Sequence, residues 1–178
     1  MSISDLSATS MTRSVPVHHA DLVGRPERKT SDMKKIDERI REHVIIYGFG
    51  LFAQAILKYL GTTPPPIVYV ELDPELEAQL RATGRPYVPG SATDPEILEA
   101  AGVRRARVLV AGTGDEAVNI SIVMAARELN PGMEIHARAA SLEGTRWLRG
   151  AGATEVVDPY RLAARAIVQD LTDEPKAS

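Results

Sequence analysis

The sequence predicts an α/β fold with a doubly wound, mostly parallel sheet covered by helices on both faces. Three observations support this class. Short apolar segments that suit buried strands alternate with helical segments from residue 43 to residue 171. A glycine turn follows the first strand and opens a helix, and an acid ends the second strand about 20 residues later. The composition is 44% hydrophobic but only 4% aromatic, so the core must be built from Val, Ile, Leu and Ala.

The segment 43–71 carries the strongest local pattern. Gly48 permits the tight turn out of the first strand, and Gly50 lacks a Cβ, so a pyrophosphate can approach the backbone. Ala53 stands where a third small residue lets the helix pack closely on the sheet. Glu71 can accept hydrogen bonds from a ribose and repels a 2′-phosphate. This is the Rossmann-like dinucleotide-binding pattern, and it favours NAD or an adenosine nucleotide over NADP.

Turn and cap residues separate the remaining elements. Asp73 suits the N-cap of a helix and Pro74 its first position, and Gly84 ends that helix. We expect strands at 43–47, 67–71, 87–88, 107–111, 134–139 and 155–157. We expect helices at 51–60, 74–83, 95–101, 116–129, 142–149 and 159–171. The prediction is therefore a six-stranded sheet with right-handed crossovers.

The length of 178 residues fits one domain with extensions. Residues 1–35 are polar with few periodic apolar positions, which is typical of a disordered arm. Residues 36–42 are charged and helix-permissive, and we expect a short lead-in helix there. The nucleotide-binding domain is expected over 43–171, followed by a tail at 172–178.

Composition excludes several classes of protein. The net charge of −3 gives no general reason to expect nucleic-acid binding. The absence of Cys excludes disulfides and cysteine nucleophiles, and four scattered His do not suggest a metal site. No apolar run approaches the roughly 18 residues of a membrane span, and the N-terminus lacks the apolar core of a signal peptide. We therefore expect a cytoplasmic protein.

Four turns are expected to meet at one edge of the sheet, because parallel strands present their carboxyl ends together. These turns lie at 48–53, 71–73, 90–93 and 112–115. In such sheets a ligand binds outside the carboxyl ends of the strands, where the strand order reverses. The convergence of these turns, more than any single motif, defines the expected site.

The chain from 42 to 168 resembles the RCK N-terminal family, also called KTN or TrkA-N, of cytosolic regulators of potassium channels and Trk-type transporters. The segments that carry the resemblance, in order and spacing, are 43–50, 71–75, 90–98, 101–103, 113–116 with Asn119, 129–131, 137–139, 150–153 and 158–162. The resemblance implies a nucleotide-binding regulatory domain acting on a separate membrane subunit.

The resemblance also implies roles for individual residues. Those expected at the phosphates are Gly48, Phe49, Gly50, Leu51 and Phe52. Those expected at the adenosine ribose are Glu71, Leu72 and Asp73. Ser91, Ala92 and Thr93 are expected to line the adenine end. Those expected to close over the phosphates or the distal end of the ligand are Thr113, Gly114, Asn119 and Arg138. The Arg138 guanidinium can pair with phosphate oxygens, although a solvated Arg138, or one paired with Glu134, is the alternative.

Three positions depart from the family pattern. Ser91 replaces an acid that usually follows Gly90, Leu51 stands where a polar residue is common, and Ala53 replaces the third glycine. These changes leave the ligand open among NAD(H), ATP, ADP and AMP.

Family members assemble as dimers and rings through the helix after the fourth strand and the last helix, so a homo-oligomer is expected. Ile120, Met124 and Ile167 are candidate contacts, each equally suited to filling the core of the domain.

Two other functions remain as alternatives. An NAD-dependent oxidoreductase fragment would share the nucleotide pattern, but we find no residues for a substrate domain and no matched proton donor; His136 lies within a strand. A nucleotide-free structural subunit is the other alternative, favoured by Ser91 and Leu51. We expect no catalytic residues, and localisation at the inner face of the plasma membrane only through a potassium channel or transporter partner.

Overall fold

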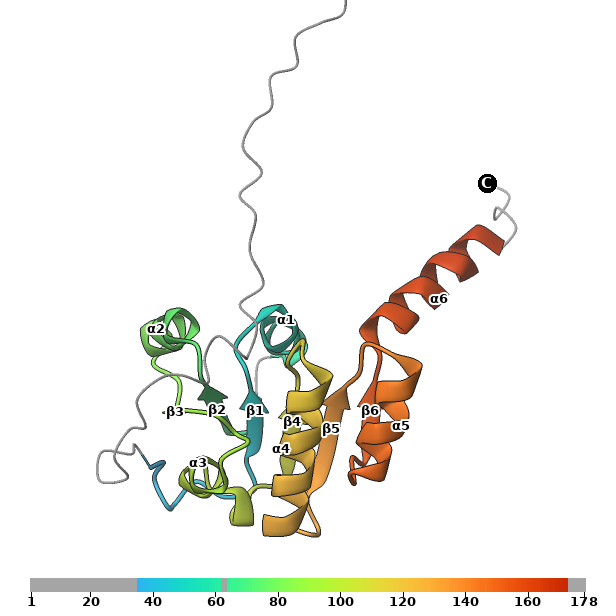
Figure 1. Ribbon diagram of the computed structural model, residues 1–178. Coiled ribbons are helices and arrows are strands. Elements are labelled where there is room, and N and C mark those ends of the chain that lie inside the picture. Colours follow the sequence, from blue (N-terminus) through green and yellow to red (C-terminus); the bar gives the residue numbers. More distant parts are fainter. Residues whose placement is uncertain (1–34, 62–63, 173–178) are drawn as a thin grey trace, which may run out of the picture.

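The computed structural model describes residues 35–61 and 64–172. Its six strands form one sheet of order β3-β2-β1-β4-β5-β6 in which every pairing is parallel (Figure 1). The strands are β1 (Val44–Tyr47), β2 (Ile67–Glu71), β3 (Tyr87–Pro89), β4 (Val108–Ala111), β5 (Glu134–Arg138) and β6 (Glu155–Val157). The helices are α1 (Leu51–Tyr59), α2 (Pro74–Ala82), α3 (Pro95–Ala100), the short 3-10 helix η3 (Val103–Arg105), α4 (Glu116–Leu129), α5 (Leu142–Gly150) and α6 (Pro159–Thr172). The predicted fold class is confirmed, and apart from η3 the ends of the elements differ from expectation by one residue at most.

Two apolar cores lie on opposite faces of the sheet. Successive strand residues point to opposite faces, so Ile45 belongs to one core and its neighbour Ile46 to the other. The first core is covered by α3, α4 and α5, which contribute Leu98, Ile122 and Leu148. The second, smaller core lies under α1 and α2. Helices therefore lie on both faces of the sheet, and α1 and α2 cover the second face chiefly over β1, β2 and β3.

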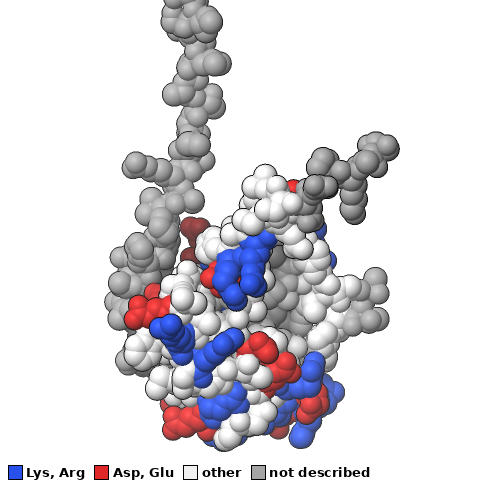
Figure 2. Space-filling model, turned by 90° about the vertical axis from the view of Figure 1, so that its right-hand side faces the viewer, with Lys and Arg blue, Asp and Glu red and all other residues white. Residues whose placement is uncertain are grey.

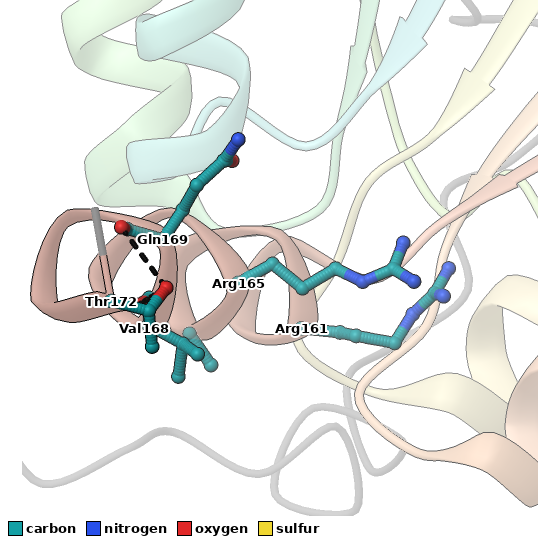
Figure 3. A pocket seen from close by; sticks show the side chains of 6 residues that line it. Arg161, Arg165, Val168, Gln169 and Thr172 are labelled. Carbon is teal, nitrogen blue, oxygen red and sulfur yellow. Dashed lines mark hydrogen bonds between the residues drawn. The ribbon is translucent and has the colours of Figure 1, made fainter. Parts of the chain in front are cut away.

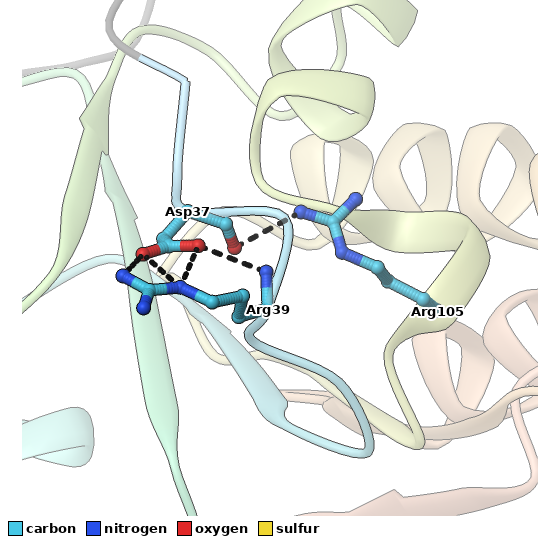
Figure 4. A network of polar contacts seen from close by, with 3 residues as sticks. All are labelled: Asp37, Arg39 and Arg105. Carbon is cyan, nitrogen blue, oxygen red and sulfur yellow. Dashed lines mark hydrogen bonds and ion pairs between the residues drawn. The ribbon is translucent and has the colours of Figure 1, made fainter.

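The lead-in helix expected over 36–42 is not present; the chain there is extended with one turn. Asp37 makes this turn, because its carboxylate accepts hydrogen bonds from the backbone N–H and the guanidinium of Arg39 (Figure 4). The bonds to Arg39 lower the pKa of Asp37 to about 2. Arg105 then holds the segment to η3 through the carbonyls of Asp37 and Ile40. Local side-chain bonds and long-range arginine contacts therefore replace the helix.

The termini fall largely outside the described residues. The expected arm at 1–35 lies outside them except for its last residue, and the expected tail at 172–178 lies outside them except for Thr172, which ends α6. On the face of the domain shown in Figure 2, acidic and basic side chains interleave, in keeping with the small net charge of −3.

Helix α6 leaves the body of the domain after β6 and projects away from the sheet (Figure 1). Pro159 is half-buried, and all the other residues of α6 are exposed, including Leu171 at 78% and Ile167 at 59%. The sequence predicted a helix over 159–171. The structure shows that the apolar side of this helix has no covering surface within the described part of the chain.

His43 is fully buried just before β1, and its burial makes the free energy of unfolding depend on pH. Its Nε2 lies 2.9 Å from the Ala101 carbonyl oxygen, and its Nδ1 has no partner among the described residues. Burial is the largest cause that lowers the pKa of His43, and nearby Arg105 lowers it further. The folded protein therefore holds a neutral imidazole, whereas the unfolded chain takes up a proton at about pH 6.5.

Stability should consequently be complete above about pH 6.5 and fall as the pH drops below it, because the unfolded state then binds more protons. We expect the urea midpoint to fall between about pH 7.5 and pH 5.5. In His43→Gln this fall should be smaller. An equal fall in the variant would contradict the assignment to His43.

Candidate nucleotide-binding site

A crevice of about 610 Å³ opens at the carboxyl ends of β1, β2 and β4. Strand register brings these ends together, since Tyr47 pairs with both Val70 and Ala111. The lining residues are Tyr47, Gly48, Gly50, Leu51, Phe52, Ala53, Glu71, Leu72, Asp73, Leu76, Gly112, Thr113, Gly114, Asp115, Val118 and Arg138. The crevice therefore lies where the strand order reverses, as expected for this class of sheet.

The glycine turn leaves the first turn of α1 free to bind an anion. Gly48 has φ +87°, a conformation that side chains other than glycine rarely adopt. Gly50 occupies the N-cap of α1, makes no side-chain cap and has open space where a Cβ would stand. By contrast, α2 to α5 each begin with an Asp or Ser whose side chain accepts a backbone N–H. Free N–H groups and the helix dipole at this point favour a phosphate.

Glu71 connects the two turns at the floor of the crevice. Its carboxylate accepts the N–H of Phe49 at 2.6 Å and the N–H of Asp73 at 2.7 Å. It is 5% exposed, and burial is the main cause that raises its pKa. A carboxylate has about four acceptor positions, so Glu71 can still accept a ribose hydroxyl beside its backbone bonds. Its side chain therefore both shapes the phosphate turn and lies where a ribose would be recognised.

Asn119 supports the β4–α4 loop from below. It is fully buried, its Oδ1 accepts the hydroxyl and N–H of Thr113, and its Nδ2 donates to the carbonyls of Thr113 and Arg138. The resemblance placed Asn119 over the ligand, whereas the structure places it beneath the loop and outside the crevice lining. Its amide therefore fixes Thr113 against the end of β5.

The Arg138 side chain closes the far side of the crevice. Its guanidinium carbon lies 5.9 Å from the centre of the Phe52 ring and 5.7 Å from that of Tyr160, and its Nη2 lies 3.4 Å from the Tyr160 hydroxyl. Its buried Nε has no hydrogen-bond partner among the described residues. A guanidinium held between two rings with an unused donor is suited to an anionic ligand.

The structure does not bring every expected residue into the crevice. Ser91, Ala92 and Thr93 lie outside its lining; Ala92 is fully buried, and the Ser91 and Thr93 hydroxyls are bonded to each other at 2.8 Å. Phe49 contributes only its backbone, because its ring packs on Tyr69 in the smaller core. Leu51 lines the crevice but is 88% exposed.

Several lining residues were missed by sequence reasoning. Tyr47, Leu76 and Val118 lie on regular elements whose orientation toward the crevice depends on the register. Tyr160 in α6 contacts Arg138, which lies 22 residues earlier in the chain, and no local sequence pattern predicted this contact. Gly112 lies in the turn at 112–115, which the sequence predicted at this edge of the sheet, and the Phe52 ring packs where its Cβ would stand.

Comparison with known proteins identifies the family. Residues 44–159 match the family model of the TrkA-N domain. The chain belongs to the TrkA-N domain family. The RCK N-terminal assignment predicted from the motifs is thereby confirmed.

Relatives of this TrkA-N domain occur in larger potassium-transport proteins. It is 30% identical over 131 residues to a probable potassium channel protein of Methanocaldococcus jannaschii, covering 72% of this chain and 38% of the relative. The chain spans less than half the length of the curated relatives it matches. No described helix is long and apolar enough to cross a membrane.

Solved TrkA-N structures share the fold. The TrkA-N domain of the inner membrane protein YbaL of Escherichia coli is 28% identical, with a TM-score of 0.71 over 76% of this chain and 99% of that one. The Kef C-terminal domain of Shewanella denitrificans, solved with AMP, is 25% identical, with a TM-score of 0.62 over 73% of this chain and 79% of that one. Structures of GsuK have been solved with NAD and with ADP.

Proposed function

We propose that this TrkA-N domain is a nucleotide-binding regulatory domain that controls potassium transport through a membrane channel or transporter. The observation that carries the proposal is the crevice, in which the uncapped start of α1 and Arg138 lie on the same cavity as Glu71. Peptide N–H groups and a guanidinium bind phosphates, and a carboxylate at the end of β2 binds a ribose. NAD, AMP, ADP and ATP all combine these two groups.

The proposal is tested by thermal-shift titration of the purified protein with NAD, NADH, AMP, ADP, ATP and NADP. A ligand at 100 times its dissociation constant adds about 2.7 kcal/mol to the free energy of unfolding. Stabilisation by an adenosine ligand, with none by NADP, is the expected result. Failure of every ligand to stabilise the protein would favour the nucleotide-free structural subunit.

We assign no catalytic role to the domain. The residues lining the crevice include no His or Lys, and the one tyrosine among them, Tyr47, is buried. The carboxylates of Glu71, Asp73 and Asp115 accept backbone N–H groups of their own turns. A dehydrogenase needs a proton donor beside the nicotinamide. Oxidation of a hydroxy acid or reduction of an aldehyde with NAD would contradict this assignment.

We also propose that the domain acts as a homodimer in which α6 of each copy covers the other. At helical spacing the apolar residues of α6 form one stripe: Tyr160, Ala163, Ala164, Ile167, Val168 and Leu171. The neighbouring stripe is polar and carries Arg161 and Arg165, whose side chains extend in the same direction (Figure 3). An apolar stripe of this size, exposed in a single copy, suits burial against a partner.

A second surface of the same chain fits this helix. A groove of about 470 Å³ lies between α1 and the face of the sheet formed by β1, β4, β5 and β6. Its apolar lining includes Phe52, Ile56, Val108, Val110 and Val157. Because one chain carries both an open groove and a helix that points away from it, two copies can exchange helices symmetrically. Of the three candidate contacts, Met124 and Ile167 are exposed, whereas Ile120 packs partly against the core.

Replacing Ile167 and Leu171 together by Glu is expected to convert the dimer to monomers. Each large apolar side chain contributes about 1.5–3 kcal/mol when buried, so the loss of two should weaken association by 100-fold or more, about 3–6 kcal/mol. Size-exclusion chromatography with light scattering measures the mass. Gln169→Glu, on the polar stripe, should remain dimeric, and a dimer that persists in the double variant would contradict the exchange of α6.

The contact between Arg138 and Tyr160 gives a physical route from ligand to partner. Arg138 lines the crevice, and Tyr160 lies in the first turn of α6. A phosphate that draws the guanidinium toward the glycine turn changes its contact with the Tyr160 ring. The ligand thereby favours one orientation of α6 over another, which is the differential interaction that regulation requires.

A further inference from the structure

The crevice carries more negative than positive charge. The charged side chains of its lining are three acids, Glu71, Asp73 and Asp115, and one base, Arg138. The position where the family often has an Arg or other polar residue is occupied by the uncharged Leu51. A ligand that enters the crevice therefore meets more acids than bases, and these acids repel the negative charges of its phosphates.

The acids stand on both sides of the cavity. Glu71 and Asp73 follow β2, and Asp115 follows β4 on the other side of β1. Tyr47 at the end of β1 lies between them, and its pKa is raised chiefly by burial and further by the charges of Glu71 and Asp115, against a lowering hydrogen bond from Ser91. The charges of Glu71 and Asp115 therefore both act on the Tyr47 hydroxyl.

The positive features are two. The first is the uncapped N-terminus of α1, with no acid in its first turn. The second is Arg138, whose Nε is unused and whose guanidinium lies near Gly114, 3.9 Å from where a Cβ of that residue would stand. A helix terminus contributes about half a positive charge and a guanidinium contributes one, so together they balance no more than two phosphate charges. A third or fourth phosphate charge would have no further cation among the lining residues and would be repelled by their acids.

We propose that the crevice selects adenosine ligands by phosphate charge, so that NAD and AMP bind more tightly than ADP and ATP. The inference rests on the proposed nucleotide-binding function and goes beyond it by naming the class of ligand. Each added phosphate charge should weaken binding about tenfold at low ionic strength, since charges at the rim of a crevice interact with an intermediate dielectric constant.

Isothermal titration calorimetry tests the order of affinities. The purified protein is titrated with AMP, NAD, ADP and ATP in EDTA at low salt and again at high salt. We expect AMP and NAD to bind most tightly and ATP most weakly, with the difference narrowing as salt screens the acids. ATP binding as tightly as AMP would overturn the selection by charge alone. No heat from any ligand would overturn both this inference and the proposed function.

Matched variants separate charge from shape. Asp115 caps α4 and Asp73 caps α2, and Asn is an equally good N-cap, so Asp115→Asn and Asp73→Asn remove charge while keeping the helices. Each should raise the affinity for ATP relative to AMP several-fold. Asp94→Asn, the same change at the cap of α3 and outside the lining, should leave the ratio unaltered. An unchanged ratio in both crevice variants, with melting temperatures retained, would overturn the inference.

Discussion

Gly50→Asp is expected to abolish nucleotide binding while leaving the domain folded. Gly50 is the N-cap of α1 with φ −70° and ψ −173°, and nothing lies within 4 Å of where its Cβ would stand. Asp is a favoured N-cap in this conformation, so its carboxylate should bond the free N–H groups of α1. The same carboxylate then occupies the place of the phosphate and repels it.

The substitution should affect stability and nucleotide affinity in opposite directions, so a loss of binding cannot be attributed to unfolding. The free energy of unfolding without ligand should stay equal or rise by a few tenths of a kcal/mol, roughly the difference between Gly and Asp as caps. Nucleotide affinity should fall by 100-fold or more, about 3 kcal/mol. Denaturant unfolding and calorimetry measure these quantities.

Gly132→Asp is the matched control. Gly132 lies in the exposed turn before β5, also with nothing within 4 Å of where its Cβ would stand, and it is not part of the crevice. We expect Gly132→Asp to bind the nucleotide with the affinity of the wild-type protein. Retained affinity in Gly50→Asp would mean that the ligand binds away from the glycine turn.

Asn119→Ala is expected to cause the largest loss of stability among polar substitutions at the site. The Asn119 amide is fully buried and bonds Thr113 three times and the Arg138 carbonyl once, at 2.8 to 3.1 Å. Ala leaves several of these buried groups without partners, at a cost of about 3 kcal/mol in the free energy of unfolding. The loop before α4 and the end of β5 should also loosen, which lowers nucleotide affinity.

Urea denaturation of wild type and variant measures this cost. Ser121→Ala provides the control on the same helix, because the Ser121 hydroxyl is exposed and makes a single bond to the Ala117 carbonyl. Its effect should stay within about 0.5 kcal/mol. A similarly small effect of Asn119→Ala would show that the amide does not hold the loop.

The fold was predictable because its signals are local. Alternating buried strands and capped helices can be read from windows of a few residues, and the chain places Asp73 and Pro74 where a helix must start. The segment before β1 was misjudged for a related reason. Helix-permissive composition there was outweighed by the Asp37 turn and by contacts to Arg105, which lies 68 residues away from Asp37.

The site was predictable only in outline. The glycine turn, Glu71 and the loop at Thr113 line the crevice as the βαβ pattern and the family resemblance indicated. The roles expected for Asn119 and Ala92 depended on which way their side chains face, and both are fully buried. Sequence spacing alone does not state that orientation, because it follows from how each loop packs on the strand beside it.

The sequence by itself determined the order of strands and helices, the glycine turn and the acid at the end of β2, since each depends on neighbouring residues. Only the tertiary structure decided that Arg138 lies between Phe52 and Tyr160, that the crevice lining carries three acids and one base, and that the apolar side of α6 is left exposed. These features depend on residues from distant parts of the chain that the parallel strand register brings together, and no local sequence pattern predicts such contacts.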